Sequence, residues 1–154
     1  MLSNNDILRR LRYSFDFYDD RMIELFSLGD FVVNRSQVSD WLKKDDDEQM
    51  QKLSDQYLAA FLNGLIAFNR GEKEGPKPIP ERRLTNNIIL RKLKIALNLK
   101  DDDMIEIFKL AGTTISKPEL SAFFRKPTHD KFRECQDQYL RNFLKGIQLK
   151  YRKD

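Results

Sequence analysis

The chain contains the same sequence unit twice. Residues 4–66 align without a gap to residues 86–148 at a constant offset of 82, and 22 of the 63 aligned positions are identical. A gapless match of this length indicates a tandem duplication of one folding unit. Because a single unit of about 65 residues buries little surface and is marginally stable alone, we expect the two copies to share a core.

The apolar residues of each copy recur at helical spacing. In the first and fourth segments of each copy they follow one another at intervals of one, three and four residues, which is typical of a buried helical stripe. The clearest stripe is Leu58, Phe61, Leu62 and Leu65, which is repeated as Leu140, Phe143, Leu144 and Ile147. No stretch of useful length alternates polar and apolar residues as a strand does. The sequence therefore predicts an all-α fold: a tandem repeat of two similar four-helix units that pack with pseudo-twofold symmetry.

Residues that cap helices occur at matching places in the two copies. We expect the first helix of each copy to open at Ser3-Asn4-Asn5 and at Asn86-Asn87, where the amide side chains can accept the N–H groups of the first turn. Acidic side chains favour the positive end of the helix dipole, and serine is a common cap. The remaining helix starts are expected at Asp19 and Asp101 for the second helix, Ser36 and Ser116 for the third, and Asp55 and Asp137 for the fourth.

Two pairs of glycines stand at informative positions. Gly29 and Gly112 follow the second helix of each copy and are expected to end it in the left-handed conformation. Gly64 and Gly146 lie inside the fourth helix, where glycine costs about 1 kcal/mol relative to alanine. A helix that carries glycine there twice predicts a close backbone approach, for which the contact between the two halves is one candidate.

A segment rich in proline and glycine separates the two copies. It contains two glycines and three prolines, which exclude a helix and favour an extended chain. We therefore divide the chain into a first helical repeat at residues 1–69, a linker at residues 70–84 and a second helical repeat at residues 85–154.

The composition is that of an ordinary globular protein, but its charge is unevenly placed. Apolar residues make up 40% of the chain and charged residues 34%, with a net charge of +4. No apolar run resembles a signal peptide or a membrane span, and the single cysteine fits a reducing compartment, so we expect a soluble cytoplasmic protein. Residues 1–82 carry a net charge of −3 and residues 83–154 carry +7. A basic half can attract nucleic acid or an acidic protein, although a solvated surface explains the difference equally well.

Several distinctive runs occur along the chain, at residues 1–9, 61–66, 80–83, 86–87, 132–135, 137–141 and 143–144. Through these runs the chain resembles, over essentially its whole length, the YehS-like proteins, a bacterial family described only as a domain of unknown function. The resemblance implies a tandem helical domain in a cytoplasmic bacterial protein. It implies no assigned activity and supplies no functional residues.

No group of residues matches a common catalytic or metal site. One histidine, His129, and one cysteine, Cys135, are too few for a zinc centre, and Cys135 aligns with Leu53, which predicts a buried apolar role. The acidic run at residues 45–48 lacks the spacing of a calcium loop, and residues 101–103 are explained by helix capping. We therefore expect no cofactor, no metal and no enzymatic activity.

One segment of the second repeat loosely resembles a helix-turn-helix. Residues 102–126 are expected to form a helix, a turn at residues 112–116 and a short helix. On its exposed face Lys117, Arg125 and Lys126 could contact phosphates, which supply most non-specific affinity for nucleic acid. The corresponding face of the first repeat runs into the acidic residues 45–48, which phosphate would repel.

The most basic surface is expected near the end of the chain. Arg141 and Lys145 lie on the fourth helix of the second repeat, where they could contact an acidic partner or simply complement the end of a helix. The leading hypothesis is a non-enzymatic binding or adaptor module that engages a protein partner through the charged faces of the repeats. Nucleic-acid binding through the helix-turn-helix-like segment is the alternative. An enzymatic site in a groove between the repeats is a third.

Overall fold

Eight helices and no strand are formed by residues 1–153, the part of the chain that the computed structural model describes. The helices are α1 (Asn4–Phe15), α2 (Asp19–Leu28), α3 (Arg35–Leu42), α4 (Asp55–Arg70), α5 (Asn86–Ala96), α6 (Asp101–Leu110), α7 (Lys117–Phe123) and α8 (Asp137–Tyr151). Each helix of the second repeat begins 82 residues after its counterpart in the first. The predicted duplicated all-α fold is confirmed.

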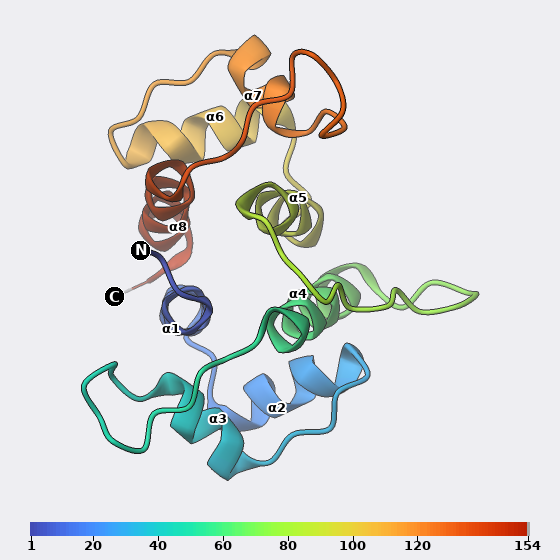
Figure 1. Ribbon diagram of the computed structural model, residues 1–154, viewed down its shortest axis with the longest axis vertical. Helices are drawn as coiled ribbons and strands as arrows, with labels where there is room; N and C mark the ends of the chain where they lie inside the picture. Colours follow the sequence, from blue (N-terminus) through green and yellow to red (C-terminus); the bar gives the residue numbers. More distant parts are fainter. Residues whose placement is uncertain (154) are drawn as a thin grey trace.

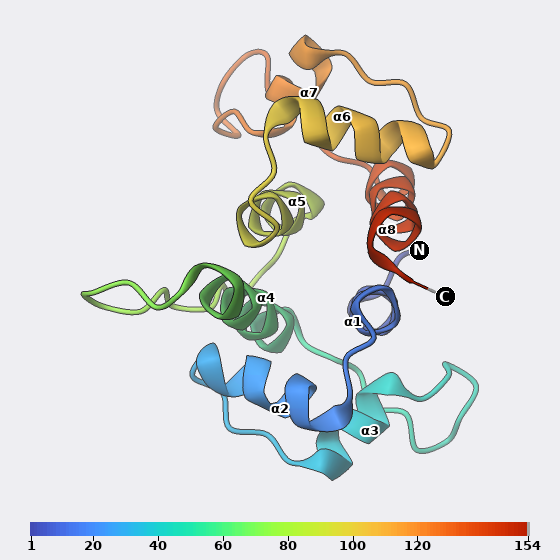
Figure 2. The same ribbon diagram turned by 180° about the vertical axis from the view of Figure 1, so that it is seen from behind.

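The first and last helices of both repeats form the centre of the molecule. Figure 1 shows α1, α4, α5 and α8 around the middle, with α2 and α3 at one end and α6 and α7 at the other; Figure 2 shows the same arrangement from behind. The main contacts between the repeats join α4 to α5 and α8 to α1, as a pseudo-twofold axis requires. One continuous core of buried apolar side chains runs through both repeats, as expected for units too small to be stable separately.

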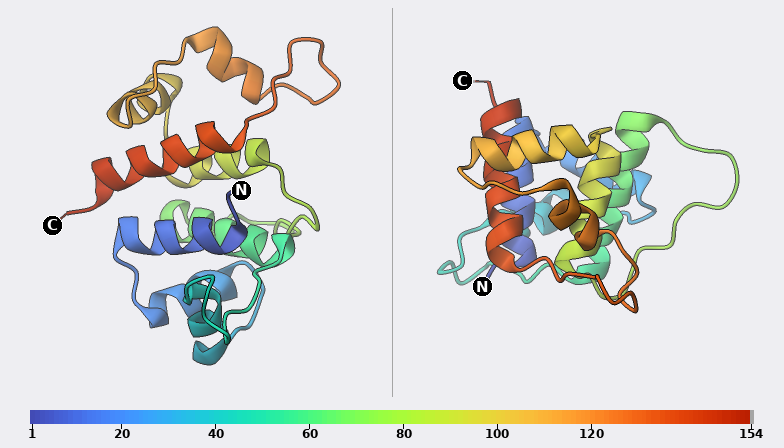
Figure 3. Two further views of the ribbon diagram at one scale, coloured as in Figure 1. Left: turned by 60° about the vertical axis from the view of Figure 1, so that its left-hand side comes forward. Right: turned by 90° about the horizontal axis from the view of Figure 1, so that it is seen from above.

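The two helices of each such pair run in the same direction. Leu2 N–H, before α1, donates to the carboxylate of Asp137 at the start of α8 (3.1 Å), and Arg152, after α8, donates to the carbonyl of Tyr13 near the end of α1 (2.7 Å). The α4–α5 pair is joined at both ends in the same way. Figure 3 shows α1 and α8 side by side with a common direction. Because parallel helix dipoles add, the carboxylates at the amino ends and the arginines at the carboxyl ends offset the resulting charges.

Two aspartates bind the repeats to each other reciprocally. Asp137 accepts from Leu2 N–H of the first repeat and from the amide of Asn86 (2.8 Å). Asp55 makes the equivalent contacts 82 residues earlier, with Leu84 N–H (2.9 Å) and with the amide of Asn4 (2.7 Å). We call these two groups the aspartate latches. The fourth helices begin at Asp55 and Asp137, as predicted, and Ser54 and Gln136 occupy the cap positions before them.

The second asparagine of each Asn-Asn pair is buried and hydrogen-bonds the first helix of its repeat to the end of the third helix and to the loop that follows it. The amide of Asn87 donates to the carbonyls of Phe123 and Arg133 (2.9 Å each), and its carbonyl accepts from Cys135 N–H (2.9 Å). Asn5 makes the same three contacts in the first repeat. Each asparagine thus fixes the loop after the third helix and satisfies backbone groups that would be costly to bury unpaired.

The first helices begin at Asn4 and Asn86, as predicted, but the asparagine amides do not cap them. Ser3 and Thr85 occupy the cap positions and accept the first-turn N–H groups. The third helix of the first repeat is capped by Asn34 rather than Ser36, and the side chain of Gln37 completes a reciprocal capping box. Asn34 aligns with Ser116, whose predicted role as a cap is confirmed.

The glycines inside the fourth helices mark close crossings, as predicted. A Cβ on Gly64 would lie 1.7 Å from the carbonyl oxygen of Leu25, and one on Gly146 would lie 2.1 Å from that of Ile107. These crossings join α4 to α2 and α8 to α6, so they lie within each repeat and not between the halves.

The expectation for the glycines after the second helices holds in one repeat only. Gly112 adopts the left-handed conformation (φ 83°), but Gly29 has φ −88° and the left-handed residue is Asp30 (φ 69°), which aligns with Gly112. Gly29 serves another purpose, because a Cβ there would lie 1.9 Å from the carbonyl oxygen of Ala60.

Replacing Gly64 with alanine should destabilise the protein although alanine favours a helix. The added methyl group collides with the Leu25 backbone, and we expect the free energy of unfolding to fall by about 2–3 kcal/mol. Urea denaturation of Gly64→Ala and Gly146→Ala measures this, with Gln148→Ala on α8 as a control for helix propensity. A Gly64→Ala protein as stable as the unmodified chain would contradict the close crossing.

The latch at Asp137 should make stability depend on pH in a defined direction. Hydrogen bonds from Asn86 and from Leu2 N–H hold the pKa of Asp137 below its ordinary value of 3.8. A lowered pKa contributes stability above pH 3.8 that is lost as the pH falls through the folded-state value. The difference in unfolding free energy between the unmodified chain and Asp137→Asn should therefore be constant near neutrality and shrink in acid. Asp46→Asn, at an exposed loop position, should show no such convergence.

Candidate functional site

Three of the predicted basic residues lie on or after the short helix α7. Lys117, its first residue, places Nζ 3.2 Å from Oδ1 of Asp102. Arg125 and Lys126 follow the helix in an exposed loop, where Arg125 Nη1 lies 3.4 Å from Nε2 of His129. The three side chains are exposed, as expected, but two of them already have partners within the protein.

The exposed face of α7 carries an acidic residue and is partly covered by the loop that follows the helix. Glu119 accepts from Ser116 N–H and forms an ion pair with Arg133 (3.3 Å). The following loop folds back on the helix, because Arg133 N–H donates to the carbonyl of Ala122 (3.1 Å). The face expected to contact phosphate is therefore mixed in charge and partly covered.

The other two predicted residues lie on α8, on the surface shared with α1. Arg141 donates to Gln138 one turn earlier (3.3 Å), and Lys145 is exposed. Within residues 1–153, no hydrogen bond or ion pair connects these two side chains with Lys117, Arg125 or Lys126. The five predicted residues therefore come from two different parts of the second repeat, α7 with the loop after it and α8.

We call the surface along which α4 packs against α5 the α4–α5 seam, and the surface along which α1 packs against α8 the α1–α8 seam. The pseudo-twofold axis relates these two seams. In the α4–α5 seam, Lys92 Nζ lies 2.7 Å from Oδ1 of Asn63 and 3.0 Å from Oε1 of Glu81. The aligned positions of the α1–α8 seam hold Arg10 and Lys145, two cations. Neither side chain has a hydrogen bond or ion pair to any residue of the described chain. The sequence reasoning missed Arg10, although its alignment with Lys92 pointed to it.

The linker follows from the parallel direction of α4 and α5. A chain that leaves the end of α4 must travel back along its whole length before α5 can begin. The returning segment bows away from the helices, as Figure 1 shows on the right of the molecule, and is held at two points: Lys77 pairs with Asp30 (3.0 Å) and Glu81 with Lys92. Between linker and helices lies a cavity of about 560 Å³, which we call the linker cavity.

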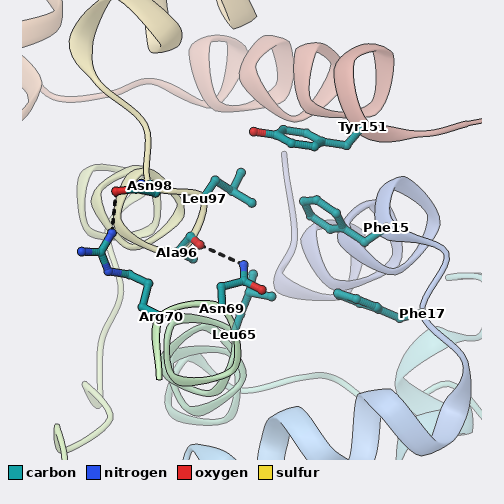
Figure 4. A pocket seen from close by; sticks show the side chains of 9 residues that line it. All are labelled: Phe15, Phe17, Leu65, Asn69, Arg70, Ala96, Leu97, Asn98 and Tyr151. Carbon is teal, nitrogen blue, oxygen red and sulfur yellow. Dashed lines mark hydrogen bonds between the residues drawn. The ribbon is translucent and has the colours of Figure 1, made fainter. Parts of the chain in front are cut away.

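A second cavity, of about 620 Å³, opens where the four central helices end. Figure 4 shows Phe15, Phe17 and Tyr151 on one side of it, and Asn69 and Arg70 on the other. Asn69 donates to the Ala96 carbonyl (2.8 Å) and Arg70 to Asn98 (2.7 Å), so its polar groups are engaged in closing helix ends. Nothing in the sequence pattern predicted this cavity, because it depends on all four helices ending together.

The residues considered for metal or nucleophilic chemistry have structural partners. Within residues 1–153, no three His, Cys, Asp or Glu side chains are grouped to hold a metal ion. Asp103 accepts from Lys100 N–H (2.8 Å) and Asp101 pairs with Lys94 (2.8 Å), which supports the capping interpretation of the acidic run. Cys135 is buried, as predicted from Leu53, and burial raises the pKa of its thiol to about 12.

Comparison with known proteins gives the family. The model of the family described as "Protein of unknown function (DUF1456)" matches residues 4–71 and again residues 86–153, and the chain belongs to this family. The two matches coincide with the two four-helix repeats. The predicted resemblance to the YehS-like proteins is thereby confirmed.

One curated relative and the search of solved structures complete the comparison. The chain is 45% identical over 148 residues to "Uncharacterized protein YehS" of Escherichia coli (strain K12), an alignment that covers 96% of this chain and 94% of that protein. No solved structure matches the chain. Among residues 1–153, no helix is both long and apolar enough to cross a bilayer.

The thiol of Cys135 should be unreactive while the protein is folded. Its side chain is buried and its raised pKa, about 12, leaves almost no thiolate at neutral pH. Labelling with a chromogenic disulfide reagent should be slow in buffer and complete in denaturant. Rapid labelling of the folded chain would show that Cys135 is accessible.

Proposed function

We propose that this protein is a non-enzymatic helical binding module, and that the α1–α8 seam engages an acidic segment of a protein partner. One observation carries the proposal: the two seams are equivalent in fold, but only in the α4–α5 seam does a carboxylate of the described chain form an ion pair with the central cation. The carboxylate of Glu81 lies against Lys92 in the α4–α5 seam, while Arg10 and Lys145 occupy the corresponding positions of the other seam.

The protein's own linker illustrates the kind of segment that suits such a seam. It is extended and rich in proline, and it brings a carboxylate to the cation at the centre of the α4–α5 seam. A partner segment with the same chemistry would supply carboxylates to Arg10 and Lys145. Charge complementarity of this kind increases the association rate and fixes the register of the partner.

Other side chains along the α1–α8 seam fit a protein interface. Arg141 lies four residues before Lys145 and therefore on the same face of α8. Tyr13 and Leu149 are 41% and 50% exposed, and Arg152 stacks on the ring of Tyr13 at 4.0 Å. Exposed aromatic and aliphatic groups flanked by arginine are typical of protein-binding surfaces.

The observations favour a protein partner over nucleic acid. Nucleic-acid binding through α7 requires cations that can reach phosphates, and Lys117 is paired with Asp102 while Glu119 lies on the same short helix. The α1–α8 seam offers a few cations among exposed apolar groups, whereas a nucleic-acid surface needs a broad basic patch.

A fluorescent peptide of about ten residues, rich in glutamate and containing proline, should bind the protein at low salt and dissociate as salt rises. The double variant Arg10→Glu, Lys145→Glu should weaken binding at least about tenfold, as expected for the loss of more than 1.4 kcal/mol. The matched double variant Arg125→Glu, Lys126→Glu should bind the peptide as the unmodified chain does. Fluorescence anisotropy measures all three affinities.

The same variants test the alternative. If random duplex DNA binds at low salt, and the Arg125→Glu, Lys126→Glu protein loses that binding, nucleic-acid recognition through α7 replaces the proposal. Peptide binding that survives reversal of Arg10 and Lys145 would also overturn it.

A further inference from the structure

A buried amide without an acceptor opens into the linker cavity. Asn63 is 7% exposed and lines the cavity, and its Nδ2 has no hydrogen-bond partner within residues 1–153. Its carbonyl oxygen accepts from Lys92 (2.7 Å), so the group that lacks a partner is the amide donor. Leaving a buried donor unpaired costs about 1–3 kcal/mol, and such groups in native proteins call for an explanation.

The walls of the cavity combine this polar point with apolar surface. Lys92, whose side chain is 11% exposed, lies beside Asn63 on the helix side. Apolar side chains from α2, α4 and α5 form most of the surface beside it, and the linker covers them from outside. Charged residues also line the cavity: Arg70 and Arg91 on the helices, Asp30, and Glu72, Lys73, Glu74, Lys77 and Glu81 on the linker. The apolar residues are Ile66, Ala67, Ile88 and Ile95, with Leu28 from α2. A concave, largely apolar space with a few convergent polar groups is the usual form of a small-molecule site.

We propose that the linker cavity binds a small amphipathic monocarboxylate, such as a medium-chain fatty acid. The carboxylate would accept a hydrogen bond from Asn63 Nδ2 and lie beside the ammonium group of Lys92. The hydrocarbon chain would lie against Ile66 and Ile95 beneath the linker. Burial of the chain supplies hydrophobic free energy, and the head group satisfies the amide that the folded protein leaves unpaired.

The available donors determine the sign of the ligand's head group. The carbonyl of Asn63 has a partner in Lys92 while its N–H donors have none, so the amide favours a head group that accepts hydrogen bonds. An amine would bring a second cationic donor toward Lys92. The buried acceptor beside it, Glu81 Oε1, has no hydrogen bond but forms an ion pair with Lys92 (3.0 Å), so an amine would have to compete with Lys92 for it. Glu81 holds Lys92 from the linker side at 3.0 Å, which fixes the ammonium group at the edge of the cavity.

The α1–α8 seam lacks the two features that form the linker cavity. Lys145 replaces Asn63 at the aligned position, and no linker covers the α1–α8 seam. The site is therefore specific to the α4–α5 side and independent of the surface proposed for the protein partner. A variant at Lys145 provides a matched control at the equivalent position.

Isothermal titration calorimetry with decanoate tests the site. The unmodified chain and Lys145→Glu should bind decanoate alike, and neither should bind decylamine. Asn63→Asp retains an oxygen acceptor for Lys92 but replaces the donor with a second carboxylate. We expect it to weaken decanoate binding at least about tenfold, as for the loss of one hydrogen bond to a charged group.

A second variant tests the hydrocarbon part and does not depend on Asn63. Ile95 is 41% exposed, so Ile95→Glu should fold, yet its carboxylate would repel decanoate and disrupt the apolar wall. Amide resonances of residues 63–67 and 92–95 should shift on titration with decanoate. No binding by the unmodified chain, equal binding of decylamine, or undiminished binding by Asn63→Asp would each overturn the proposal. Loss of peptide binding in Arg10→Glu, Lys145→Glu with decanoate binding intact would separate the two sites.

Discussion

In each half of the molecule, one carboxylate binds the backbone segment that precedes the first helix of the other half. Asp137 binds Leu2 N–H before α1, and Asp55 binds Leu84 N–H before α5, while each also accepts from an asparagine of its own repeat. These contacts set the starts of neighbouring helices side by side, so that α1 runs with α8 and α5 runs with α4. In that arrangement the apolar stripes of the four central helices face one another and form the shared core. The two aspartate latches thus fix the register in which the parallel centre of the molecule packs.

The parallel direction has a further structural effect on the chain between the repeats. Antiparallel helices can be joined by a short turn, whereas parallel ones require a connection that returns along their length. Here that connection is the linker, and its return path encloses the cavity that contains the free donor of Asn63. No such connection spans the α1–α8 seam. Two seams of common origin thus differ in enclosure, in charge and in the kind of molecule that suits each.

Much of the fold could be predicted from the sequence, because the repeat offset and the apolar spacing depend on the chain alone. Helix bounds followed, except where a cap had several candidates: Asn34 and Ser36 are both good capping residues, and only the repeat alignment with Ser116 separates them. The roles of Asn87 and Asp137 could not be read locally, since their partners lie up to 135 residues away. The candidate site was harder still. Lys145 was predicted as one basic residue among many. The roles of Arg10 and of the amide donor of Asn63 could not be predicted, because they depend on the packing of α1 against α8 and of α4 against α5.

The reciprocal latches do not require that the two repeats be covalently joined. A single repeat contains one latch aspartate and one backbone segment before its first helix. Two separate copies could therefore associate as a symmetric homodimer in which both latches form and no linker covers either seam. In such a dimer every substitution would occur in both seams at once. Fusion into one polypeptide removes that restriction, because a change at position 63 no longer imposes the same change at position 145. Gene duplication with fusion is thus what allows one seam to become enclosed while the other stays accessible to a second macromolecule.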